Sequence, residues 1–155
     1  EQMPCVSQKF PTYNEFAVAD LETIYGKENL ENAVHYSATS FSSVILMSNA
    51  SGFESIKLNE YAQMSPINSG ITLDVNNDGH LDFIGVGNNF AAEVETVRYD
   101  AGRGVVLLGD GIGNFSFVQP INSGFFSNTD DKDLLQIGNQ FFISSNNYYI
   151  KSFNF

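Results

Sequence analysis

The sequence predicts an all-β fold made of short antiparallel strands. Its 155 residues include 14 phenylalanines, 7 tyrosines and 13 glycines, a composition that favours strands joined by tight turns. Apolar residues make up 43% of the chain, which is enough for one domain with a real core. The pentapeptide Pro-Ile-Asn-Ser-Gly occupies residues 66–70 and recurs, 54 residues later, at 120–124. Repeats of this length indicate a supersecondary unit that buries its faces by stacking on copies of itself.

Each copy of the repeat contains short apolar runs separated by glycine turns. We expect strands near residues 41–47, 53–58, 69–74 and 82–86 in the first copy, near 104–109, 115–119, 123–127 and 133–137 in the second, and near 140–144 and 148–154 after it. Residues 49–52 and 110–114 are hairpin signals, because Gly and Asn tolerate positive φ. Four short strands in about 50 residues is the size of a propeller blade. The sequence therefore predicts about two β-propeller-type repeats, each a four-stranded antiparallel sheet.

The first 40 residues have a different pattern. Thr12 and Glu15 are spaced as a capping box, and a rough apolar stripe from Phe16 to Ile24 follows them. A second short helix is expected near residues 28–35. The expected organisation is a lead-in with one or two short helices over 1–40, a first repeat with a metal loop and connecting segment over 41–100, and a second repeat with a C-terminal strand over 101–155.

Charge and composition exclude several classes of partner. The chain has 18 acidic and 7 basic residues, a formal charge of −11, whereas nucleic acids and anionic membranes require a basic surface. No apolar run approaches the ~20 residues needed to span a bilayer, so membrane insertion is not expected. Cys5 is the only cysteine, so no internal disulfide can form. We read the chain, which starts without a signal peptide or initiator Met, as a processed product or a piece of a longer protein.

Residues 74–82 carry the most specific motif. Oxygen-bearing side chains recur at alternate positions, and Gly79 permits a sharp turn. This pattern suits Ca²⁺, which takes six to eight oxygen ligands at roughly 2.3–2.6 Å. The expected ligands are the side chains of Asp74, Asn76, Asp78 and Asp82 and the backbone carbonyl of His80. The loop is not an EF-hand, because its twelfth position is Gly85 and its flanks are strand-like. A polar turn without metal is the alternative.

Three features together resemble a known family. They are the loop at 74–82, the Gly-Asp-Gly-x-Gly-Asn-Phe turn at 109–115 and the repeat of about 55 residues, and they resemble the FG-GAP/VCBS β-propeller repeats found in integrin α-subunits. The likeness is closer to the C-terminal part of large VCBS repeat-containing proteins of Bacteroidetes-type bacteria. Matching landmarks occur at residues 11–13, 20–27, 93–96, 98–102 and 123–126.

The resemblance implies a bacterial propeller that is secreted or associated with the cell surface and outer membrane. It implies Ca²⁺ on the five expected ligands, and adhesion to a protein or polysaccharide. Residues 127–133 lack the glycine and contain Lys132, so we expect a plain acidic turn there and only one metal site. Propellers close with four to eight blades, so two repeats should either belong to a larger propeller or self-associate.

The link between the repeats is the second candidate site. Glu93 and Glu95 would share one face of a strand, and Arg98 and Asp100 follow them. Salt bridging with loop packing is the expected role of this segment, and contact of these four residues with a ligand or a second cation is the alternative. The pair of carboxylates also allows a carbohydrate-active lyase or hydrolase that uses Glu93, Glu95 and Arg98. A third alternative is a purely structural end of a larger propeller. We do not expect an enzyme.

Overall fold

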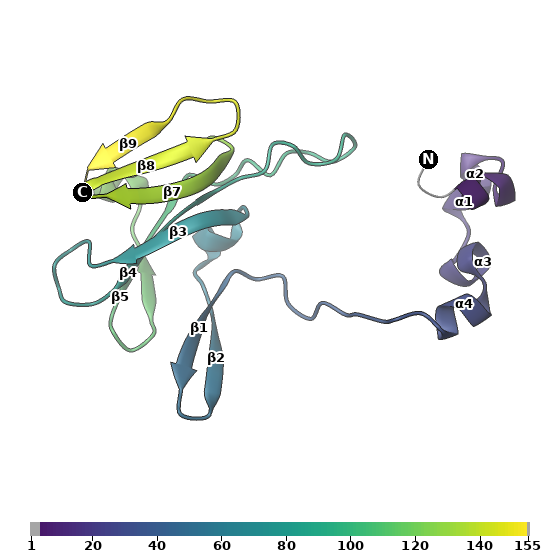
Figure 1. The fold of residues 1–155 in the computed structure, drawn as a ribbon, viewed down its shortest axis with the longest axis horizontal. Helices are drawn as coiled ribbons and strands as arrows, with labels where there is room; N and C mark the ends of the chain where they lie inside the picture. The colour runs from purple at the N-terminus through teal and green to yellow at the C-terminus, as the bar shows by residue number, and fades with distance from the viewer. Residues whose placement is uncertain (1–3, 155) are drawn as a thin grey trace. The chain divides into compact units, whose positions relative to one another are not determined.

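The computed structural model describes residues 4–154 and divides the chain into two compact units, with the boundary between Ser40 and Phe41 (Figure 1). Within residues 4–40, four short helices follow one another: α1 (Pro4–Lys9), α2 (Tyr13–Ala17), α3 (Leu21–Tyr25) and α4 (Lys27–Glu31). The elements of the second unit are β1 (Val44–Asn49), β2 (Gly52–Lys57), the 3₁₀ helix η1 (Glu60–Gln63), β3 (Ile67–Leu73), β4 (Asp82–Gly87), β5 (Val105–Gly109), β6 (Phe115–Phe117), α5 (Pro120–Ser123), β7 (Asp131–Ile137), β8 (Gln140–Ser145) and β9 (Lys151–Asn154).

The helical unit contains the predicted capping box. The Glu15 N–H donates to Thr12 Oγ1 at 3.3 Å, and the Thr12 N–H donates to Glu15 Oε2 at 3.2 Å. The apolar stripe does not form one helix, because α2 ends at Ala17 and Asp20 caps a new helix through the N–H of Thr23. None of the residues in these four helices is buried, so the unit has little core of its own.

The strands form three antiparallel sheets. β1 and β2 make a hairpin, β3-β4-β5-β6 make a four-stranded sheet that we call the central sheet, and β7-β8-β9 make a three-stranded outer sheet (Figure 1). The prediction of an antiparallel, mostly β fold with an N-terminal helical segment is confirmed. The strands are not grouped into two sheets of four, however, because β5 pairs with β4 across the expected boundary between the repeats. Residues 4–154 form no closed barrel or propeller.

One expected strand is absent, because residues 124–127 belong to no helix or strand. Residues 123–127 were expected to be extended, but α5 ends at Ser123 and Gly124 adopts a left-handed conformation with φ of 69°. The hairpin signals are confirmed, since residues 49–52 join β1 to β2 and residues 110–114 join β5 to β6.

The first core lies between the central and outer sheets. Strand alternation places Ile84 and Val86 of β4 on the face that meets the outer sheet. The fully or nearly fully buried members are Ile84, Val86, Val106, Phe125, Leu134, Phe141 and Ile143. β7 packs against β3 and β4, so β7 is the strand that joins the outer sheet to the central sheet.

The second core lies on the opposite face of the central sheet. Val105 and Leu107 of β5 point to that face and pack with Leu58 and Ala62, the latter from η1. Ile45 of the hairpin packs against the same cluster. The central sheet is therefore buried on both faces and is the middle of three layers.

Candidate functional site

The predicted metal loop connects β3 to β4 at one end of the central sheet. Asp74 directly follows β3 and is half-buried, whereas Asp82 begins β4 and is fully buried. Two residues in the loop, Asn77 at φ of 61° and Gly79 at φ of 88°, have left-handed backbones. Asn and Gly adopt this conformation at low cost, so the local sequence permits the tight turn.

The loop wraps around its own carboxylates. Asp74 accepts hydrogen bonds from the N–H groups of Asp78 at 3.1 Å and Gly79 at 2.8 Å. Asp78 accepts from the N–H of His80 at 2.8 Å and from the side-chain amide of Asn76 at 2.8 Å. The Asn76 amide and the His80 N–H hold the pKa of the Asp78 carboxyl below its ordinary value. Asp78 therefore remains ionised at neutral pH and faces solvent.

Asp82 has a different role from the other carboxylates. One of its oxygens accepts from the Val75 N–H at 2.8 Å, and the other accepts from the Gly109 N–H at 2.9 Å. Asp82 thus ties the loop after β3 to the end of β5. A side chain at Gly109 is impossible without a backbone shift, because its Cβ would lie 2.2 Å from the Leu81 carbonyl oxygen.

The loop fits a hard cation in its chemistry but not as a preformed cage. Its donors are all oxygens, and a carboxylate oxygen that accepts one hydrogen bond keeps a second lone pair for a metal. Within residues 4–154, however, no three His, Cys, Asp or Glu side chains converge on a point that could hold an ion. The Asp74, Asp78 and Asp82 carboxylates are each directed at backbone N–H groups, so a cation would have to draw them together.

The link between the repeats is a long loop whose two ends are joined by backbone pairing. Asn89 and Tyr99 form a β-bridge, with backbone hydrogen bonds of 2.9 and 3.0 Å. Arg98 lies over the Phe90 ring at 4.7 Å and forms an ion pair with Asp100 at 3.3 Å. This places two of the four candidate ligand-contact residues together, in an ion pair.

The two glutamates of the link are not part of that cluster. Glu93 and Glu95 are exposed, and neither side chain forms an ion pair with another residue of the region described. Val94, which lies between them, is fully exposed. The structure therefore brings Arg98 and Asp100 together and leaves the glutamates in solvent.

The expected acidic turn near residues 127–133 is a buried polar cluster. Asp131 is fully buried and accepts hydrogen bonds from the hydroxyls of Ser127, Thr129 and Ser145. Lys151 donates to Ser127 and Thr129 and lies 3.6 Å from Asp131. The sequence predicted only a plain acidic turn here, because Ser145 and Lys151, which complete the cluster, come from later strands.

Asp130, beside this cluster, is also buried. Burial raises the pKa of its carboxyl, but the hydrogen bonds from Lys132 at 2.6 Å and from the Asn146 amide lower it by more, so the pKa lies below its ordinary value. Lys132, expected to disfavour a cation in this turn, instead neutralises Asp130.

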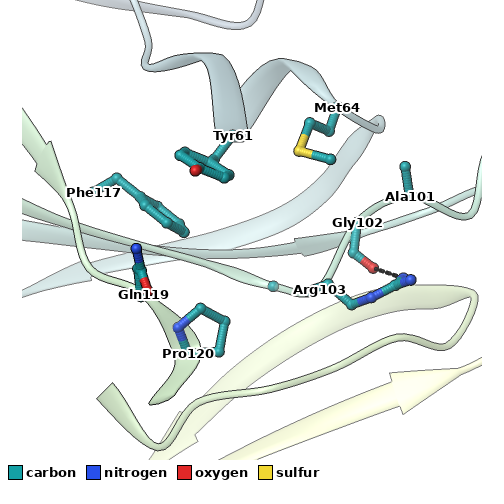
Figure 2. Close-up of a pocket in the computed structure, with 9 residues that line it drawn as sticks. Tyr61, Met64, Ala101, Gly102, Arg103, Phe117, Gln119 and Pro120 are labelled. Atoms are coloured by element: carbon teal, nitrogen blue, oxygen red, sulfur yellow. Dashed lines mark hydrogen bonds between the residues drawn. The ribbon is translucent and has the colours of Figure 1, made fainter. Parts of the chain in front are cut away.

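Two hollows adjoin the central sheet. An apolar groove of about 610 Å³ lies beside the metal loop, between Ile45 and Met47 of the hairpin and His80 and Phe83. A smaller hollow of about 300 Å³ is shown in Figure 2. Its walls include Tyr61, Met64, Arg103, Phe117, Gln119 and Pro120.

Sequence reasoning did not find the smaller hollow. Its residues come from four separate segments: η1, the residues before β5, the end of β6 and the start of α5. No spacing in the sequence relates these segments.

Comparisons of the chain with protein-family models, with curated proteins and with solved structures found no match. Within residues 4–154, no helix has both the length and the apolar character needed to cross a membrane.

Proposed function

We propose that this chain is a calcium-binding segment of β-propeller type that serves as a binding or adhesion module for a protein or polysaccharide. It would act outside the cell or at the outer surface of a bacterium, and it is not proposed as an enzyme. The observation that carries this proposal is the loop at residues 74–82. The pKa of its Asp78 carboxyl is lowered, its oxygen-bearing side chains alternate along the chain, and the loop lies at the end of a sheet buried on both faces.

A calcium ion would be held by the side chains of Asp74, Asn76, Asp78 and Asp82 and by the His80 carbonyl. The ion would neutralise charges that now depend on backbone N–H groups and the Asn76 amide. Because Asp82 also bonds to Gly109 of β5, an ordered loop would fix that end of the central sheet. In this proposal the metal sets the geometry of the loop and performs no chemistry.

The layered sheets support the blade-like part of the proposal. The hairpin, central sheet and outer sheet stack through two separate cores, as successive blades would. Apolar side chains remain exposed on the two end layers, including Leu46 and Phe53 on the hairpin and Leu135 and Ile137 on β7. Further blades of a larger propeller, or a second copy, would cover these faces.

The arrangement of the link offers no support for a lyase or hydrolase. General acid and base groups work where a cleft excludes water. Glu93 and Glu95 are exposed, and Arg98 is engaged by Asp100 and Phe90. Ligand contact through Arg98 and Asp100 remains part of the proposed binding role.

Removal of calcium tests the proposal. Extracellular modules bind Ca²⁺ with Kd of ~10⁻⁴–10⁻³ M, so ~10 mM Ca²⁺ should stabilise the native state by about 1.5–3 kcal/mol. We expect excess chelator to lower the melting temperature by about 3–8 °C relative to that condition. Asp78→Ala should abolish the difference, because it removes a ligand from an exposed position in the loop. Circular dichroism melting curves provide the measurement.

Asp110→Ala is the matched control. Asp110 is also an exposed turn residue that accepts backbone N–H groups and an asparagine amide, and its pKa is also lowered, first by the Asn114 side chain. It should keep the calcium response if the 74–82 loop is the site. Identical melting curves with calcium and with chelator in the unaltered protein would refute the metal site.

A further inference from the structure

The smaller hollow lies at the end of the central sheet opposite to the metal loop. Val105 pairs with Gly85 near the end of β4, whereas Gly109 lies beside Leu81 near its start. Residues 101–104, which precede β5 and line the hollow, are therefore one strand length away from the loop. Substitutions in the hollow and in the metal loop can therefore be tested separately.

Arg103 is the charged group of this hollow. Its Nη1 donates to the carbonyl oxygens of Asp100 at 2.9 Å and Gly102 at 3.1 Å, and both bonds are within its own segment. None of the ion pairs among residues 4–154 includes Arg103, and no acidic side chain lines the hollow. Backbone carbonyls thus orient the guanidinium while its charge has no carboxylate partner, in a chain with more than twice as many acids as bases.

Aromatic and apolar side chains form the wall across from Arg103. The Tyr61 and Phe117 rings stack with centroids 4.1 Å apart and planes 11° from parallel. Figure 2 shows this pair on the side away from Arg103, with Met64 beside Tyr61 and with Gln119 and Pro120 below Phe117. Tyr61 is 44% exposed although it is part of this stack, so the wall is open to a ligand.

We propose that this hollow binds a carboxylate carried on a single six-membered ring. A guanidinium with free N–H groups pairs with a carboxylate through two parallel hydrogen bonds. The Tyr61–Phe117 wall supplies apolar surface for the ring, and the Gln119 amide supplies a donor and an acceptor for ring hydroxyls. A volume of about 300 Å³ is at the lower limit for ligand pockets and limits the occupant to about one ring.

Two sources carry this chemistry: the uronic acid residues of an acidic polysaccharide, and small aromatic acids. The inference rests on the proposed binding role, and it deepens that role by naming a ligand class. It does not depend on calcium at the opposite end of the sheet.

The test is a titration of ¹⁵N-labelled protein, followed by NMR through the amides of Gly102 and Gly104. The probes are glucuronate, galacturonate, benzoate and neutral glucose. We expect saturable, millimolar binding of at least one acid, at least tenfold weaker binding of glucose, and weakening at higher salt. Arg103→Gln should weaken acid binding at least tenfold, and Arg103→Lys should weaken it less because the charge remains.

Lys57→Gln is the matched control, since it removes one positive charge from an exposed position of β2 that does not line the hollow. It should bind the acid as the unaltered protein does. Binding of a uronate identifies a saccharide source, and binding of benzoate alone identifies an aromatic acid. Absence of acid binding, equal binding of glucose, or unchanged binding in a folded Arg103→Gln variant would overturn the inference.

The outcomes separate this inference from the calcium proposal. Asp78→Ala should lose the calcium response and still bind the acid, whereas Arg103→Gln should keep the calcium response and lose the acid. An Asp78→Ala variant that is folded but has lost acid binding would contradict the independence of the two sites.

Discussion

The two copies of Pro-Ile-Asn-Ser-Gly have the same five residues and different structures. Residues 66–70 lead into and form the start of β3 (Ile67–Leu73), whereas residues 120–124 form α5 (Pro120–Ser123) and its C-terminal cap. The pentapeptide therefore does not determine its own conformation. The difference must come from the flanking sequence and from contacts with distant strands.

The helical copy contains a complete set of local signals. Pro120 occupies the first helical position, where its fixed φ fits and its missing N–H costs nothing. Gly124 ends the helix in a left-handed conformation, and its N–H donates to the Pro120 carbonyl at 2.8 Å. The backbone N–H groups of Asn122, Ser123 and Gly124 all donate to the carbonyl oxygens of Gln119 or Pro120, so the hydrogen bonds of the helix are local.

The strand copy depends on partners outside the pentapeptide. Ile71, Thr72 and Leu73 continue it with strand-forming residues, and β4 pairs along its length. A β-bulge between Ile67 and Ser69 shifts the register, so Ile67 packs in the second core while Ile71 and Leu73 pack against the first. Tertiary pairing overrides the local tendency of this copy to turn.

The glycines of the two copies should differ most on substitution. A Cβ at Gly70 would lie 2.5 Å from the Phe83 ring and 2.9 Å from the Ile84 carbonyl oxygen, so the sheet would have to shift. We expect Gly70→Ala to reduce the free energy of unfolding by about 2–3 kcal/mol. Gly124 has no atom within 4 Å of its Cβ position, but its φ of 69° disfavours alanine by about 1 kcal/mol. Urea denaturation of the two variants gives the comparison.

A larger loss for Gly124→Ala than for Gly70→Ala would show that the helical cap, and not the close approach of β3 to Phe83, is the more constrained feature. It would also contradict the view that only the strand copy is held by tertiary contacts.

The same distinction explains what the sequence could predict. Turns at residues 49–52 and 110–114 were predictable because Asn and Gly fix them locally, and the loop at 74–82 was placed correctly between two strands for the same reason. The strand expected at 123–127 was wrong because the repeat was assumed to impose one conformation on both copies. The grouping of strands into sheets was also wrong. Gly85 pairs with Val105 because the long loop between β4 and β5 returns to the same sheet, and the sequence does not show where that loop returns.

In the candidate sites too, local features could be predicted from the sequence, whereas contacts between distant segments could not. Alternating oxygens in residues 74–82 are visible in the sequence, but the hydrogen bond from the Gly109 N–H to Asp82 spans 27 residues and is not. The hollow around Arg103 is assembled from four segments, so only the folded chain reveals that Tyr61 and Phe117 face it.

The asparagines of the two copies provide a second comparison. The Asn68 amide donates to the carbonyl oxygens of Asn88 at 2.8 Å and Asp131 at 2.7 Å, and both of these residues are buried. Asn68→Ala leaves these acceptors without that donor and should cost about 2 kcal/mol. Asn122 is exposed, and its side chain forms no hydrogen bond with the described part of the chain, so Asn122→Ala should change stability by less than about 0.5 kcal/mol. Thermal and urea unfolding measure both variants, and equal effects would contradict the assigned role of Asn68.

Alanine variants of the two serines should differ least in free energy of unfolding. They should differ clearly in which backbone amides exchange faster. Ser69 Oγ donates to Asp133 at 2.7 Å and accepts from the Leu134 N–H at 3.1 Å, so it links β3 to β7 of the outer sheet. Within residues 4–154, Ser123 Oγ accepts from the Phe125 N–H alone, at 3.2 Å and two residues away. Each alanine variant should lower the free energy of unfolding by about 1 kcal/mol or less. For Ser69→Ala the loss is small because the Leu134 N–H also donates to the side chain of its neighbour Asp133, at 2.9 Å.

Hydrogen exchange distinguishes the two variants. Ser69→Ala should speed exchange at Leu134, 65 residues away in the chain, whereas Ser123→Ala should speed exchange only near Phe125. If Ser69→Ala leaves the Leu134 amide as protected as before, the strand copy is held by its pairing with β4 alone, and the outer sheet does not help to select its conformation.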